Sequence, residues 1–236
     1  MIEIILLIST VLFIFALKLF GRPSTAHKAN SFAMLAMALA VFSAFNFDFS
    51  KYDSAFYITI VVSGLLGVLI SKRVQMTQMP ELVGLFNGFG GGASGAIAYV
   101  ELSNTSLLIS DVFVAIFSMV IGIFTFSGSL IAVLKLRGKL NNFSTKLGNI
   151  FSVFLPTILI IPAVLEMDTF LNEFIILVAL IAGVIRVAVI GGADMPVVIA
   201  FLNSLSGIAA MSAGFIVNSI ISVSYTHLTL PTNSLV

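Results

Sequence analysis

Long runs of apolar residues alternate with short polar connections along the chain. Each run is long enough, or nearly so, to cross the roughly 30 Å hydrocarbon layer of a bilayer as a helix rising about 1.5 Å per residue. The strands of a membrane barrel would be short and would alternate polar with apolar residues. The pattern therefore predicts an all-α integral membrane protein, a bundle of eight transmembrane helices. The expected spans are residues 2–20, 31–47, 54–71, 80–100, 110–134, 149–166, 171–190 and 195–217.

The end of the chain differs in kind from the rest. The apolar run from Phe215 to Val223 gives way to SYTHLTLPTNSLV, a polar stretch with several Thr and Ser residues. We interpret this pattern as the start of a ninth helix followed by a tail, residues 224–236, that is disordered or not native to the fold. The expected transmembrane domain is therefore residues 1–223.

The first apolar run has the features of a retained helix. It begins with Glu3 rather than a basic region, and its positive charges, Lys18 and Arg22, follow it. A cleaved signal peptide would show the opposite order and a small-residue cleavage site. We therefore expect a multi-pass protein of the cell inner membrane whose N-terminus lies outside.

The distribution of charge supports the count of eight helices. If the helices alternate in direction, ten of the 11 Lys and Arg residues fall on one side of the membrane, and only Lys51 falls on the other. Basic residues concentrate on the cytoplasmic side of membrane proteins. The ten are Lys18, Arg22, Lys28, Lys72, Arg73, Lys135, Arg137, Lys139, Lys146 and Arg186.

Composition narrows the class of function. The chain is 59% hydrophobic and 9% charged, whereas an ordinary soluble domain is about one quarter charged. The formal net charge of +1 gives no reason to expect a nucleic-acid partner. The absence of Cys excludes disulfides and thiolate metal sites, and His27 and His227 lie in polar stretches. We therefore expect no metal site.

Two acidic residues, Glu81 and Asp194, fall on the basic side of the predicted topology. Each lies beside a Met-Pro pair at a predicted helix start. A carboxylate in the first turn of a helix meets the positive end of the helix dipole, so helix capping accounts for either residue. A functional role at this side of the membrane accounts for them equally well.

Two of the predicted helices begin alike. The stretch MPELVGLFNGFGGGASG, from Met79, aligns with MPVVIAFLNSLSGIAAM, from Met195, and the two starts are 116 residues apart. Asn87 and Asn203 each fall seven residues after the proline. A parallel duplication of four helices explains the match, and chance similarity between apolar helices is the alternative.

The glycines of the first stretch are spaced by four. Small residues at this spacing form a flat stripe that lets helices pack closely in lipid, so we interpret them as packing residues. They also free backbone carbonyls for water, which is tolerated beside protein or a wet cavity. Their resemblance to a dinucleotide fingerprint is discarded because no strand precedes them. The packing glycines are Gly84, Gly88, Gly92, Gly91 and Gly95.

The asparagines allow two interpretations. An amide in hydrocarbon without a partner costs several kcal/mol, so such residues face the bundle interior. Either they join helices through hydrogen bonds, or their matched depth marks a polar pathway. The hydroxyls of TFSGS, Thr125 to Ser129, either extend that pathway or bond to their own helix. No Asp, Glu, His or Lys lies in the middle of a predicted helix, so protons would have to move along ordered water.

These motifs carry a resemblance to a known family. The stretches KRVQMTQMPELVGLFNG, FTFSGSLIAVLKLRGKL and IGGADMPVVIAFLNSLSGIAAMSAGF are similar to the membrane domain of the beta subunit of proton-translocating NAD(P) transhydrogenase. Their order and spacing agree up to about Val223. The resemblance implies a membrane domain that couples inward proton movement to hydride transfer from NADH to NADP⁺ between soluble domains.

The resemblance also assigns expected roles to four residues. Asn87, Ser129 and Asn203 fall at proton-path positions of the family. Well-known members carry a protonatable His where this chain has Asn87, which disfavours a mechanism that protonates this side chain. Asp194, in GGADMP, falls at the cytoplasmic mouth, where the family couples the channel to the NADP(H) domain.

The family's chain continues through a further helix into a soluble NADP(H)-binding domain, which this sequence does not contain. We therefore expect no catalytic hydride-transfer site and no cofactor on this chain, with NADP(H) and NAD(H) bound by the complete complex. The implied partners are the missing C-terminal domain, an alpha subunit and the lipid bilayer, in a dimer of the whole complex. Two alternatives remain: a secondary transporter with a midplane solute site between two four-helix repeats, and a structural anchor.

Overall fold

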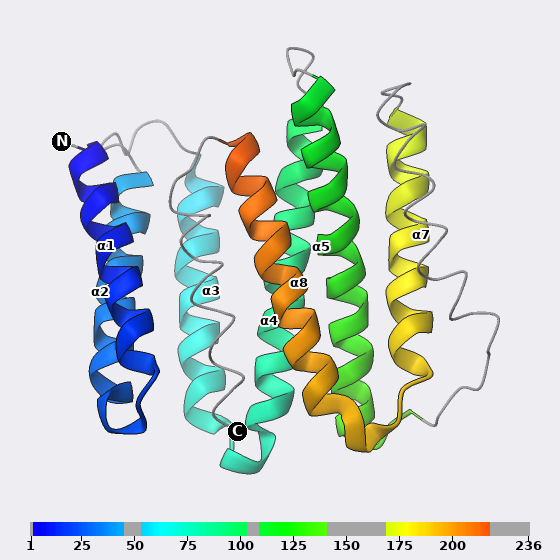
Figure 1. Cartoon of the computed structure of the whole chain (residues 1–236), viewed down its shortest axis with the longest axis horizontal. Coiled ribbons are helices and arrows are strands. Elements are labelled where there is room, and N and C mark those ends of the chain that lie inside the picture. Colours follow the sequence, from blue (N-terminus) through cyan, green and yellow to red (C-terminus); the bar gives the residue numbers. More distant parts are fainter. Residues whose placement is uncertain (1, 45–52, 103–108, 141–168, 218–236) are drawn as a thin grey trace.

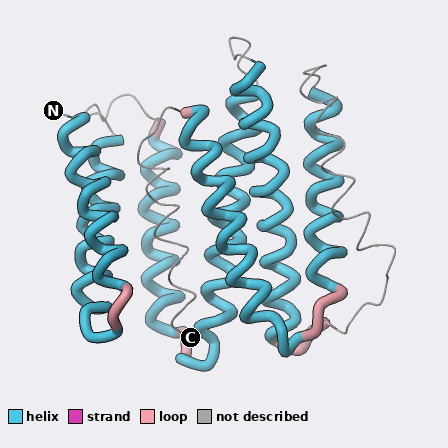
Figure 2. The backbone as a smooth tube through the Cα atoms, viewed as in Figure 1, coloured by secondary structure: helices cyan, strands magenta, loops and turns pink. Residues whose placement is uncertain are grey.

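The chain forms helices throughout the part that the structure describes. The computed structural model describes residues 2–44, 53–102, 109–140 and 169–217, and these contain α-helices and short 3₁₀ turns with no strand. Figure 2 shows the helices lying side by side, joined by short connections where these are described. The predicted all-α class is confirmed for these residues.

The helix bounds follow the apolar runs, with polar residues extending some ends. One helix begins at Ala26, whereas the sequence predicted a start at residue 31. The difference arises because the first turn of this helix is polar, as a connection would be. The predicted span 149–166 and the start of a ninth helix lie outside the described residues. The α-helices are α1 (Ile2–Phe20), α2 (Ala26–Ala44), α3 (Ser54–Arg73), α4 (Met79–Leu102), α5 (Ile109–Leu136), α7 (Thr169–Ala188) and α8 (Met195–Ile216).

Five of these helices are long and apolar enough to cross a membrane: α1, α3, α5, α7, and α8 together with the short turn before it. The other two, α2 and α4, fall short because polar residues and glycines lower their mean hydropathy. In α2 these are His27, Lys28 and Asn30, and in α4 they are Asn87 and the glycines. The predicted count of eight helices and part of a ninth is therefore not established.

Helix α5 is the centre of the bundle. It packs against α4, α7 and α8, and α4 also packs against α8. Helices α1 and α2 form a separate hairpin, and α3, which has no buried residue, lies between this hairpin and the bundle in Figure 1. The α4–α5–α8 group is therefore the place where an interior exists.

The directions of the helices place charge at opposite ends. In Figure 1, α2, α4 and α8 run upward, and α1, α3, α5 and α7 run downward. All nine described Lys and Arg residues consequently lie at the lower end, together with Glu81 and Asp194. The other described carboxylates lie at the upper end: Glu3, Asp53, Glu101, Asp111 and Glu173. We call these the basic and acidic ends.

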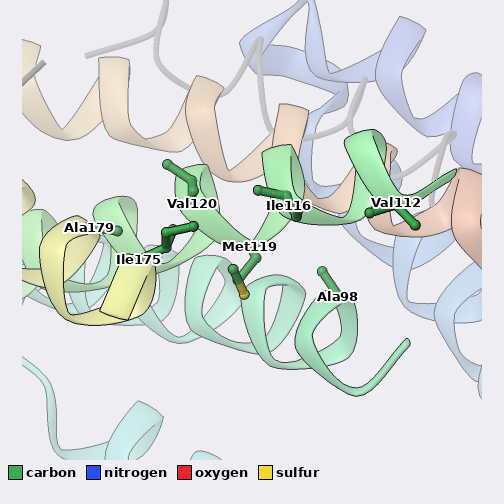
Figure 3. Packing of buried hydrophobic residues seen from close by; sticks show 7 residues of the cluster. All are labelled: Ala98, Val112, Ile116, Met119, Val120, Ile175 and Ala179. Atoms are coloured by element: carbon green, nitrogen blue, oxygen red, sulfur yellow. The ribbon is translucent and has the colours of Figure 1, made fainter. Parts of the chain in front are cut away.

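Two apolar clusters lie on either side of a more polar layer of α5. Figure 3 shows the cluster toward the acidic end, where α4, α5 and α7 meet around Met119. The second, toward the basic end, joins α5, α7 and α8 around Ala132 and Leu202. Between them α5 buries Thr125, Ser127 and other small residues. The clusters hold the helices together, so the layer between them can hold polar groups.

Candidate functional site

Helices α4 and α5 approach each other closely through glycines. A Cβ atom at Gly122 would lie 2.5 Å from the Gly91 carbonyl oxygen and 2.7 Å from the Gly95 nitrogen. The opposing position is also tight, since a Cβ atom at Gly91 would lie 2.9 Å from the Gly122 carbonyl oxygen. Only glycine fits this crossing, so the backbones of the two helices are in contact.

The other glycines of α4 lie along the same face. Cβ atoms at Gly84, Gly88, Gly92 and Gly95 would lie 3.0 or 3.1 Å from side chains of α5. Gly90 differs, because a Cβ atom there would meet nothing within 4 Å. All five glycines expected to pack helices therefore face α5.

This close approach joins Asn87 to α5. The buried Asn87 side chain donates from Nδ2 to the Ser129 hydroxyl oxygen at 2.9 Å. The Ser206 hydroxyl of α8 donates to the Asn87 backbone carbonyl at 3.1 Å. The amide oxygen, Asn87 Oδ1, is buried and has no protein hydrogen-bond partner. Asn87 thus links three helices, and its amide oxygen remains a hydrogen-bond acceptor without a protein donor.

A cavity of about 370 Å³ lies beside this point, between α4 and α8. Both Asn87 and Asn203 line it, each eight residues from the start of its helix, which is about 12 Å along the axis. The predicted match in depth therefore corresponds to a shared cavity wall. The lining residues are Val83, Phe86, Asn87, Gly90, Ser94, Asn203, Ser206, Gly207 and Ala210.

The hydroxyls of α5 differ in their hydrogen-bond partners. Ser127 donates to the Phe124 carbonyl of its own helix at 3.1 Å, which is the local bonding expected as the alternative. Thr125 is fully buried, and its hydroxyl has no partner. Ser118 donates to the Ala209 carbonyl of α8 at 2.8 Å. Ser118 and Ser129 therefore form hydrogen bonds with neighbouring helices, whereas the Thr125 hydroxyl forms none.

The chemistry of this layer is that of neutral hydrogen-bonding groups. An unpaired buried acceptor costs about 1–3 kcal/mol, and a water molecule in a roomy polar cavity removes that penalty. Among the described residues, no three His, Cys, Asp or Glu side chains gather to hold a metal ion. Asn87 Oδ1 is therefore an acceptor to which a water molecule can donate a hydrogen bond.

The two acidic residues of the basic end have different surroundings. Glu81 forms an ion pair with Arg137, with Oε2 2.6 Å from Nε, which joins the start of α4 to the end of α5. Asp194 precedes α8 in the 3₁₀ turn Gly192–Asp194, is exposed, and makes no side-chain capping bond. Hydrogen-bonded capping therefore does not account for Asp194. It lies nine residues before Asn203, about 13 Å along the helix, and is not part of the cavity wall.

Sequence reasoning missed three features of this site. It did not place Ser94 or Ser206 at the cavity, although Ser206 follows Asn203 by three residues. It did not recognise that Ser118, Gly122, Thr125 and Ser129 are spaced by four, three and four, the spacing of one helix face. It also read Lys135 only as a marker of the basic side, whereas its side chain is buried.

Apolar outer faces around buried amides and hydroxyls define a multi-pass membrane protein with a cavity between two of its helices that both apolar and polar residues line. Residues 2–228 match the family model of the NAD(P) transhydrogenase beta subunit, and the chain belongs to this family. The predicted resemblance is thereby confirmed.

Two curated relatives carry the name of the same subunit. Both are named NAD(P) transhydrogenase subunit beta, one from Rhodospirillum rubrum and one from a named strain of that species. Each is 31% identical over 233 residues, covering 89% of this chain and 48% of the relative. The chain thus spans about half the length of the curated relatives it matches. The boundary at residue 223 stays a prediction, and the family match reaches residue 228.

Proposed function

We propose that this chain is the proton-translocating membrane part of an NAD(P) transhydrogenase, a translocase that is also an oxidoreductase. Hydride would pass from NADH to NADP⁺ on soluble domains outside these 236 residues. The observation that supports this most is the cavity lined by Asn87 and Asn203, where a buried amide oxygen has no protein partner.

Water in this cavity would carry the proton. Neither asparagine titrates near neutral pH, so each amide orients water instead of holding the charge. Asn87 Nδ2 donates to Ser129, whose hydroxyl keeps its own hydrogen for a further acceptor. Asn87 Oδ1 accepts from a cavity water, and Asn203 faces the same water from α8. Ser129, Asn87 and Asn203 then form one hydrogen-bonded route across the middle of the bundle.

Asp194 would couple this route to the nucleotide domains. It is exposed at the basic end and starts the helix that carries Asn203. A domain that contacts Asp194 could displace α8 and so change the distance between Asn203 and Asn87. Basic residues mark the cytoplasmic side, so Asp194 would face the cytoplasm and the N-terminus would lie outside the inner membrane.

The proposed complex includes domains that lie outside these 236 residues. We propose an alpha subunit and a C-terminal NADP(H)-binding domain as partners, in a dimer of the whole complex. NAD(H) and NADP(H) would bind to those parts, and this chain would hold neither. Residues 1–223 would form the membrane domain, and 224–236 a tail outside it.

The test is proton flux in the reconstituted complex. The chain is expressed together with the proposed NADP(H)-binding domain and an alpha subunit, and internal pH is followed in liposomes while NADH and NADP⁺ are added. Replacing Asn203 or Asn87 with Leu should remove proton movement per hydride transferred. Ser204→Ala is the matched control, because Ser204 bonds to the Ala200 carbonyl of its own helix and does not line the cavity. Full proton movement in both Leu variants would rule out the route.

The solute-transporter alternative has one observation in its favour. A cavity of about 370 Å³ is at the lower end of the range for small-molecule sites. Its described lining includes no charged side chain, which leaves neutral solutes as the candidates. Solute uptake by liposomes that contain this chain alone, lost in Asn203→Leu, would favour the transporter over the redox pump.

A further inference from the structure

Lys135 differs from the other basic residues of the basic end. It lies in the last turn of α5, and only 5% of it is exposed, whereas Lys72, Arg73 and Lys139 are exposed. Burial of an ammonium group is unfavourable unless hydrogen bonds replace its water. A side chain that only marked the cytoplasmic surface would be expected to extend into solvent.

The Lys135 ammonium group donates to one carbonyl oxygen at the end of α7 and to another just after it. Its Nζ atom donates to the Ala188 and Ile190 carbonyl oxygens, each at 2.5 Å. Ala188 is the last residue of α7, and the final carbonyls of a helix lack partners within it and carry partial negative charge. Lys135 therefore caps α7 from α5.

These acceptors lie at the start of the connection to α8. Ile190 is followed by Gly191 and by the 3₁₀ turn Gly192–Asp194, which leads directly into α8. Two consecutive glycines make this segment easy to bend. Since Lys135 holds the residue before them, it fixes one end of a bendable segment whose other end is Asp194.

Helix α5 links this anchor to the cavity. Ser129, which accepts from Asn87, lies six residues before Lys135, or about 9 Å along the helix. Two residues after Lys135, Arg137 pairs with Glu81 at the start of α4. Lys135 and Arg137, at and just after the end of α5, therefore contact the connection that leads to α8 and the start of α4.

We propose that Lys135 is a positioning residue that sets the α7–α8 connection, and with it Asp194, relative to the Asn87–Ser129 pair. Displacement of Asp194 would pull on the Ile190 carbonyl, and the Lys135 side chain would pass the displacement to α5. The structural part of this inference stands by itself, and its consequence for proton coupling rests on the proposed function.

The structural part is tested on the full chain in nanodiscs. The sequence contains no cysteine, so spin labels can be attached to Lys139→Cys and Ala193→Cys, both exposed positions at the basic end, without background. Lys135→Met should broaden the distribution of distances between the labels. Lys72→Met, the same change at an exposed lysine of that end, should leave it unchanged. Equal widths in the two variants would overturn the proposal.

The functional part is tested in the complete complex. Lys135→Met should lower protons moved per hydride about fivefold or more, the scale of a typical coupling between sites. Lys135→Gln keeps an N–H donor, so its number of protons moved per hydride should lie between those of Lys135→Met and the parent. Coupling equal to Lys72→Met would overturn the functional part. If both Lys135 variants failed to fold while Lys72→Met folded, Lys135 would be needed only for stability. That result would overturn the proposal that it is a positioning residue. A parent complex that moves no protons would reject the proposed function, while the label distances would still decide the structural part.

Discussion

The contact between α4 and α5 gives a prediction whose size follows from the coordinates. In Gly122→Ala the new methyl group would lie 2.5 Å from the Gly91 carbonyl oxygen and 3.0 Å from the Gly95 Cα atom. Since carbon–oxygen contacts between close backbones lie near 3.3–3.6 Å, the helices must separate by about 1 Å. That separation would stretch the 2.9 Å bond between Asn87 and Ser129 past hydrogen-bonding distance.

The expected loss of stability combines two effects. Overpacking of a close contact costs about 1–3 kcal/mol, and a lost buried hydrogen bond costs about 1 kcal/mol, so we expect Gly122→Ala to lose about 2–4 kcal/mol. Gly64→Ala in α3 is the matched control, because a Cβ atom there meets nothing within 4 Å. Alanine favours a helix over glycine by up to about 1 kcal/mol, so this control should be neutral or slightly stabilised.

The measurement is SDS-induced unfolding in mixed micelles, followed by far-UV circular dichroism. Gly122→Ala should unfold at a lower SDS fraction than the parent chain, and Gly64→Ala at an equal or higher one. If Gly122→Ala unfolded together with Gly64→Ala, the two helices would not be in backbone contact. The link between the glycine face and the Asn87–Ser129 bond would then be wrong.

Two further predictions concern the basic end. Asp194→Asn should uncouple hydride transfer from the proton gradient in the complete complex while leaving the amount of folded protein unchanged; unchanged coupling would limit Asp194 to a structural role at the start of α8. Glu81→Gln should lower stability by about 0–1 kcal/mol in the SDS assay, because its partner Arg137 is 49% exposed and solvent weakens such a pair; a loss above about 3 kcal/mol would show that the pair behaves as a buried one.

Within the described residues, the predicted apolar spans coincide with observed α-helices, because apolar runs and helices coincide in a bilayer. The sequence also predicted that Asn87 and Asn203 lie at matched depth, because each lies the same number of residues after the Met-Pro pair that begins its helix. The start of α2 at Ala26 was missed because hydropathy does not detect a polar first turn. Helix pairing was beyond prediction, because a glycine stripe does not specify which helix it meets. The burial of Lys135 could not be predicted either, because it depends on the end of α7 lying beside α5, and the sequence does not specify this helix pairing.

The parallel direction of α4 and α8 has an electrostatic consequence. Both helices begin at the basic end, so the positive ends of their dipoles, each equivalent to about half a charge, lie at the end where α5 and α7 have their negative ends. The nine described cationic side chains are distributed over this end of the molecule. A hydrated cation approaching from that end therefore meets a repulsive potential. Glu81 is already paired with Arg137, so Asp194 supplies the compensating negative charge. Any partner that shields or withdraws the Asp194 carboxylate would raise this barrier, so the cavity would close to ions without any change in its width.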